Sequence, residues 1–111
     1  MTPEARKLLE DMRDAAGDVA TFTVGKSLQE YLADRLLRRA VERSFEIVGE
    51  ALSQLNKIDP ATATSIADYR KIISFRNVLI HGYGKVDDQL TWSIIETDLP
   101  TLRRELDQLL A

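Results

Sequence analysis

The sequence lacks cysteine altogether, and it has one histidine among its 111 residues. The absence of cysteine excludes disulfides, thiolate metal sites and a cysteine nucleophile, and it fits a reducing compartment. Charged residues interrupt every apolar stretch, so none approaches the roughly 20 residues that span a bilayer. The N-terminus turns acidic and amphipathic at once and has no signal-peptide pattern. We therefore expect a cytoplasmic protein with a single domain, residues 1–111.

Net positive charge is lacking as well. The formal net charge of −3 argues against a protein that coats nucleic acid by neutralising phosphates, so any contact with RNA must be local. The charges are unevenly placed: residues 35–43 hold four arginines and one glutamate, whereas residues 87–98 hold four acids and no base. Solvated helix faces of different sign explain this pattern as well as a binding surface does.

Helical periodicity is present along the whole chain. Apolar residues recur every three or four positions, and no segment alternates as a strand does. Thr2 before Pro3, and Ser27 with Glu30 three positions later, are N-capping patterns. We expect helices over about residues 3–22, 27–56 and 67–82, with a short helical turn after the Asp-Pro pair at 59–60.

Glycine and proline are few, and their positions indicate where helices end or approach each other. Gly82 and Gly84 are expected to end the third helix, since both allow a left-handed backbone. Asp87 can cap a further helix, and Pro100 either separates it from a last helix or kinks one continuous helix. Gly49, within the long second helix, is expected to permit close packing. The pattern predicts an all-α fold, an antiparallel up-and-down bundle of four to five helices.

The lone histidine, His81, falls near the expected end of the third helix, where it is accessible. Arg76 lies five positions earlier, so a regular helix sets the two residues about 140° apart. Asn77 shares a face with His81, and Tyr83 lines up with Arg76. Uncoiling at Gly82 could bring all four groups around one anion. The alternative is that Arg76 and His81 only cap carbonyls beside a helix C-terminus, where positive charge is favoured.

Other chemistries lack the residues that they need. A metal site is not expected, because there is one histidine, no cysteine and no Glu-x-x-His pair. A serine triad would have only His81 as its base, and no Gly-x-Ser-x-Gly elbow is present. No glycine-rich phosphate loop occurs, so we expect no cofactor.

The segment from Arg76 to Tyr83, RNVLIHGY, resembles the R-x4-H-x-Y motif of HepT toxins, the RNA-cleaving branch of the HEPN superfamily. The stretch from Leu36 to Leu52, which ends in FEIVGEAL, is similar to the second helix of that family. The DLPTL block at residues 98–102 is similar to one near the family's C-terminus. The likeness covers about residues 4–110, and these blocks in this order are far more specific than the motif alone.

The resemblance implies a metal-independent endoribonuclease that acts as a homodimer, with two copies of the motif facing each other in a cleft. RNA cleavage through the 2′-hydroxyl needs a base, an acid and a positive group on the phosphate, and two-fold pairing would supply a second copy of each group. We assign His81 the acid/base role, Arg76 phosphate binding, and Asn77 the orientation of the substrate or of His81. Arg39 and Arg43, one turn apart, are candidates for secondary contacts with the RNA, an mRNA or a tRNA.

In this family the tyrosine of the motif accepts AMP groups from a minimal nucleotidyltransferase antitoxin of the MntA type, in type VII-like toxin–antitoxin systems. The resemblance implies that Tyr83 is the modification site, where each added nucleotide would place a negative phosphate beside Arg76 and His81. Two alternatives remain. One is a non-catalytic helical partner, or substrate-binding subunit, of a nucleotidyltransferase. The other is an inert four-helix scaffold, for which the apolar stripes would suffice.

Overall fold

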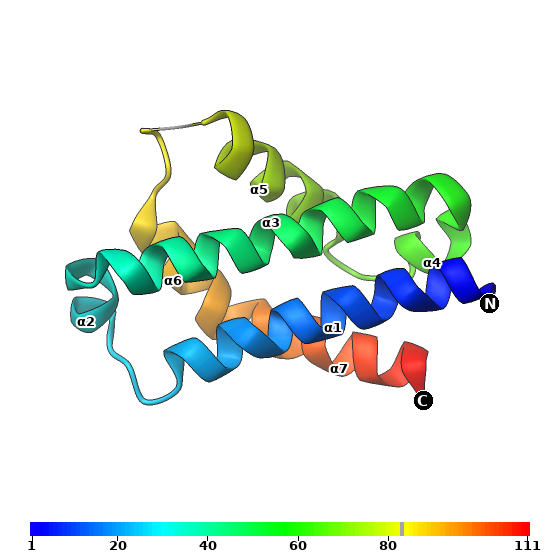
Figure 1. Cartoon of the computed structure of the whole chain (residues 1–111), viewed down its shortest axis with the longest axis horizontal. Coiled ribbons are helices and arrows are strands. Elements are labelled where there is room, and N and C mark those ends of the chain that lie inside the picture. The colour runs from blue at the N-terminus through cyan, green and yellow to red at the C-terminus, as the bar shows by residue number, and fades with distance from the viewer. Residues whose placement is uncertain (83) are drawn as a thin grey trace.

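Long helices laid side by side build the molecule, for which a computed structural model describes residues 1–82 and 84–111 (Figure 1). Within these residues there are seven helices and no strand. They are α1 (Pro3–Thr23), α2 (Leu28–Ala33), α3 (Arg35–Ile58), α4 (Pro60–Thr64), α5 (Tyr69–His81), α6 (Asp88–Thr97) and α7 (Leu99–Leu110). The prediction of an all-α fold is confirmed, although two short helices raise the number above the expected four to five.

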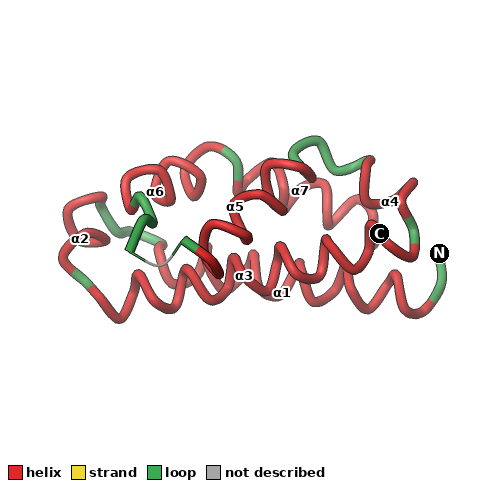
Figure 2. Tube along the Cα trace, turned by 90° about the horizontal axis from the view of Figure 1, so that it is seen from above, coloured by secondary structure: helices red, strands yellow, loops and turns green. Residues whose placement is uncertain are grey.

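The long helix α1 packs against α3 and against α7, and α5 packs on α3. Figure 1 shows α1 running opposite to α3 and α7, and α5 running opposite to α3, which confirms the up-and-down arrangement. Figure 2 shows α2 at one end of the long axis and α4 near the other. Leu79 is the one buried residue of α5, so this helix lies at the edge of the bundle.

The core follows the apolar stripes of the sequence. Its largest buried aliphatic side chains are Leu9 and Met12 of α1, Leu52 and Leu55 of α3, Leu106 of α7, and Ile66 between α4 and α5. Burial of such side chains is the main favourable contribution to folding, at roughly 1.5–3 kcal/mol for each.

The predicted caps begin their helices. The Thr2 side chain accepts a hydrogen bond from the Ala5 amide at 3.1 Å, and Ser27 and Glu30 form both bonds of a capping box. Asp87 accepts hydrogen bonds from two amides of the first turn of α6. Each cap satisfies amide groups that a helix start leaves without partners.

The prediction of one helix over residues 27–56 was wrong. The chain turns at Asp34, whose extended backbone (φ −113°, ψ 96°) ends α2, and whose carboxylate accepts the Leu37 amide at 3.0 Å to begin α3. Aspartate competes with helix formation in this way because its side chain bonds to nearby backbone amides. In the short α2, Tyr31 is buried and its ring lies 5.3 Å from that of Trp92.

The observed start and C-cap of α5 differ from those predicted. The helix starts at Tyr69, two residues later than expected. Gly82 ends it with a right-handed backbone (φ −91°), its amide donating to the carbonyl of Val78 at 2.6 Å, so the expected left-handed cap at Gly82 was wrong. Gly84 does have a positive φ of 79°. At the other boundary, Pro100 lies in the first turn of a separate α7, which confirms the first of the two alternatives.

Candidate functional site

The candidate site begins where α5 crosses α3 at Gly49. A Cβ atom built on Gly49 would collide with the Cβ of Arg76, and it would lie 2.7 Å from the Cγ of Arg76 and 3.4 Å from the carbonyl oxygen of Ile72. Only glycine allows the two helices to come this close. The prediction that Gly49 permits close packing is confirmed, and the side chain that it admits is the arginine of the motif.

The guanidinium group of Arg76 is held from two sides. Its Nη2 donates a hydrogen bond to Oε2 of Glu50 on α3, and its Nη1 donates to Oδ1 of Asn77 at 3.0 Å. The Nε atom is buried and makes no hydrogen bond with any described residue. The side chain of Arg76 is 23% exposed, against 47% for Glu50. The arginine is therefore fixed along its length while part of its charged end still reaches solvent.

Glu50 is in turn held by a second partner. The amide of Gln54, one turn further along α3, donates to Oε1 of Glu50 at 3.0 Å. This hydrogen bond and the nearby charge of Arg76 lower the pKa of the Glu50 carboxyl. A lowered pKa keeps the carboxylate ionised and able to accept from the guanidinium.

His81 is the last residue of α5 and is exposed to solvent. No hydrogen bond joins it to Arg76 among the described residues, so within one chain the two predicted catalytic groups lie on the same helix but are not bonded to each other. Asn77 is exposed and bonded to Arg76, whereas helical spacing had placed it on the face of His81. Tyr83, the predicted modification site, lies outside the described residues.

The predicted secondary RNA contacts, Arg39 and Arg43, are exposed on α3. Each is paired with the glutamate three residues later, at 3.2 Å in both cases. Both arginine side chains are exposed, at 59% and 71%, and pairs with exposed arginines within one helix are weak, so both guanidinium groups remain available to other anions. The basic and acidic stretches of the sequence also meet each other, through an ion pair of 3.6 Å between Arg38 and Asp88.

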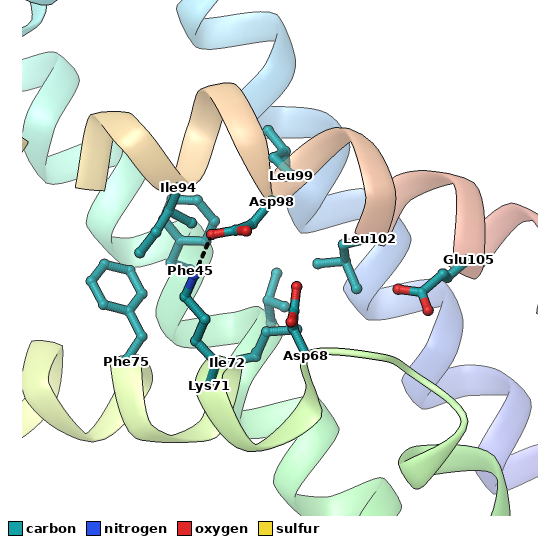
Figure 3. Close-up of a pocket in the computed structure, with 11 residues that line it drawn as sticks. Phe45, Asp68, Lys71, Ile72, Phe75, Ile94, Asp98, Leu99, Leu102 and Glu105 are labelled. Carbon is teal, nitrogen blue, oxygen red and sulfur yellow. Dashed lines mark hydrogen bonds and ion pairs between the residues drawn. The ribbon is translucent and has the colours of Figure 1, made fainter. Parts of the chain in front are cut away.

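A small apolar pocket lies between α3, α5 and the junction of α6 with α7 (Figure 3). Phe45, Phe75 and Ile94 line it, and the 2.7 Å ion pair between Lys71 and Asp98 lies at its edge. Its volume of about 30 Å³ has room for one water-sized group. This pocket was not foreseen in the sequence, and its lining suits packing better than catalysis.

The residue that sequence reasoning missed is Glu50. It stands in the FEIVGEAL block, directly after the glycine that admits α5. That adjacency is the available signal, since the residue beside a close helix crossing is well placed to reach the partner helix.

The described residues include no metal-binding cluster and no membrane-spanning helix. No group of three or more imidazole or carboxylate side chains there is placed to hold a metal ion. In the same part of the chain, no helix is long and apolar enough to cross a membrane.

Comparisons with known proteins place the chain in a family. The family model described as "Ribonuclease HepT-like" matches residues 12–109. A protein of Methanocaldococcus jannaschii, named "Putative RNase MJ1380", is 31% identical over 94% of each chain. The "Probable ribonuclease HepT" of Thermococcus cleftensis is 30% identical over 91% of each chain. No solved structure gives a significant match. The chain carries the Arg76 and His81 pair on one exposed helix and belongs to the HepT-like ribonuclease family.

Proposed function

We propose that this protein is a metal-independent endoribonuclease toxin and that Arg76 and His81 from two copies of the chain form one active site. The observation that carries the proposal is the fixed guanidinium of Arg76 on the same helix as the exposed, lone His81, in a chain of a ribonuclease family. A guanidinium held in one orientation can bind two phosphate oxygens with little loss of entropy. The substrate class is RNA, an mRNA or a tRNA, met in the cytoplasm.

A second copy of the chain supplies the second proton-transfer group that one chain lacks. Cleavage through the 2′-hydroxyl needs both a base and an acid, and each chain has one histidine. Apolar side chains on the helix that carries Arg76 and His81 favour pairing: Val78 and Ile80 of α5 are 45% and 42% exposed. A second copy of the chain could cover these exposed side chains.

In the proposed reaction, the neutral His81 imidazole of one copy takes the proton of the 2′-hydroxyl as that oxygen attacks phosphorus. The protonated imidazole of the other copy gives its proton to the departing 5′-oxygen. The products are a 2′,3′-cyclic phosphate and a 5′-hydroxyl end. The Arg76 guanidinium groups stabilise the negative charge that builds on the non-bridging oxygens, while Arg39 and Arg43 contact the flanking phosphates.

The test compares the wild-type protein with His81→Ala and with Lys85→Ala as a control, on a labelled RNA in the presence of EDTA. We expect cleavage by the wild type and by the control, and a loss of about 10²-fold or more for His81→Ala. Full activity of His81→Ala would contradict the proposal. A wild-type protein that binds a nucleotidyltransferase but never cuts RNA would support the non-catalytic partner instead.

The activity of the toxin is controlled by modification of Tyr83. An MntA-type nucleotidyltransferase antitoxin transfers AMP from ATP to Tyr83: the phenol oxygen attacks the α-phosphorus, pyrophosphate leaves and the phenol proton passes to solvent. Tyr83 is two residues after His81, so the added phosphate would compete with RNA for the positive site. We expect Tyr83→Phe to cut RNA and to escape the antitoxin, as shown by intact-mass measurement after co-expression. Unchanged cleavage by the fully modified wild type would contradict this mechanism.

A further inference from the structure

We propose that Glu50 is a positioning residue of the site, which acts through Arg76 by holding its guanidinium in the orientation that receives the scissile phosphate. The inference rests on the proposed function, since it assigns a role within the same site. Glu50 lies on α3, 26 residues before Arg76 in the sequence, and its carboxylate accepts a hydrogen bond from Nη2 of Arg76.

The contacts around Arg76 hold its guanidinium group in one orientation. Glu50 accepts from one terminal nitrogen, and Asn77 accepts from the other. Each of these nitrogens carries two N–H groups, so each keeps a second N–H beyond the bond described. The aliphatic part of the side chain is packed against Gly49. Two N–H groups on a fixed plane suit two oxygens of one phosphate.

Glu50 differs from the other glutamates that pair with arginines on α3. Glu42 and Glu46 pair with exposed arginines of the same helix, three residues away. The pair of Glu50 and Arg76 instead joins two helices, and its arginine is mostly covered. The other oxygen of Glu50 is held by Gln54 at 3.0 Å, so the carboxylate itself has a fixed position from which to orient its partner.

This arrangement has opposite effects on binding and on catalysis. The negative charge of Glu50 reduces the attraction of Arg76 for RNA, because it lies against the same guanidinium. Its hydrogen bond keeps the guanidinium aligned, and misplacement of such a group can lower a rate by about 10²-fold. Removal of Glu50 should therefore lower kcat without raising KM.

The experiment measures kcat and KM for RNA cleavage by Glu50→Ala and Glu50→Gln. We expect kcat to fall about 10- to 100-fold in Glu50→Ala and by less in Glu50→Gln, with KM unchanged or lower in both. Asp11→Ala is the matched control: Asp11 is paired with Lys7 at 2.7 Å on α1, and its loss should change neither constant. Thermal unfolding of each variant checks that the fold is intact, and Glu50→Gln keeps the volume of the side chain if Glu50→Ala fails to fold.

A double-mutant cycle tests whether Glu50 acts through Arg76. In an Arg76→Ala background, Glu50→Ala should cause no further loss, because the group that it positions is already absent. Independent, multiplying losses would overturn the proposal, since they would mean that Glu50 acts on the RNA or on the reaction directly. Loss of activity in Arg76→Ala with wild-type kcat in Glu50→Ala would overturn it as well, while leaving the proposed function intact.

A second readout is independent of RNA cleavage. In the ¹⁵N-labelled protein, the terminal nitrogens of Arg76 should give separate, slowly exchanging signals in the wild type and averaged signals in Glu50→Ala. Averaged signals in the wild type would contradict a fixed guanidinium. If the signals behave as expected but neither the wild type nor any variant cuts RNA, the proposed function fails and the catalytic role of Glu50 fails with it.

Discussion

Gly49 of α3 faces Arg76 of α5 so closely that a methyl group on Gly49 would overlap the first side-chain carbon of the arginine. The next residue, Glu50, receives the guanidinium at the end of the same side chain. One turn of α3 therefore provides both the space for Arg76 and the carboxylate that orients it. The close crossing of α3 and α5 is a requirement of the site as well as of the fold.

Gly49→Ala should destabilise the protein and lower its activity together. The added methyl group must displace α5, and overpacking of this kind costs typically about 1–3 kcal/mol. Gly17→Ala on α1 is the matched control, because nothing lies within 4 Å of a Cβ at Gly17. That change should stabilise the helix by roughly 0.5–1 kcal/mol. Urea unfolding measures the change in unfolding free energy for both variants. A Gly49→Ala variant as stable and as active as the wild type would contradict the close crossing of α3 and α5.

The contribution of Glu50 to stability should depend on pH. Its pKa is lower in the folded protein than its ordinary value of 4.5, because of Gln54 first and then Arg76. Between the two pKa values the unfolded chain binds more protons, so the contribution is fully present above the ordinary value and declines as the pH falls through the folded one. The difference in unfolding free energy between wild type and Glu50→Gln should stay constant from pH 7 to near the ordinary value of 4.5 and shrink on further acidification below it. A difference that stays constant or grows below that value would be inconsistent with this pairing.

Tyr31→Phe should preserve the free energy of unfolding or raise it. The Tyr31 hydroxyl is buried and makes no hydrogen bond with any described residue. Burial, followed by the nearby charges of Asp88 and Glu42, raises the pKa of this phenol. An unsatisfied buried hydroxyl costs about 1–3 kcal/mol, which the phenylalanine would not incur. Tyr31→Ala, which also removes the ring from Trp92, should lose about 3 kcal/mol or more. A large loss in Tyr31→Phe would reveal a partner for the hydroxyl.

Much of the fold could be predicted from local signals in the sequence. Thr2, Ser27 and Asp87 start helices because their side chains bond to amides only two or three residues away. The break at Asp34 was missed because the apolar stripe continues across it, although the Asp34 carboxylate accepts the Leu37 amide and begins a new helix there. A pattern of apolar residues carries no information about such a change of direction.

In the candidate site, too, the residues signalled by local sequence were predicted, and the contacts made between helices were not. Arg76 and His81 stand in one short segment and were predicted from it, and the structure places both on α5. Glu50 was missed because it meets Arg76 only through the crossing of α3 and α5, which no local spacing encodes. The bond between Asn77 and Arg76 was missed for a related reason: helical spacing describes faces, whereas a long arginine side chain can turn back to a neighbour.

The most direct test of the account asks whether two copies of His81 serve one phosphodiester. Mixed dimers of wild-type and His81→Ala chains, carrying different affinity tags, can be purified through both tags and assayed on RNA beside wild-type dimers. A shared site predicts that the mixed dimer loses about 10²-fold in rate, because one of its two proton-transfer groups is missing. Half of the wild-type rate in the mixed dimer, or full activity in a monomeric protein, would show that each chain works alone and would contradict the account.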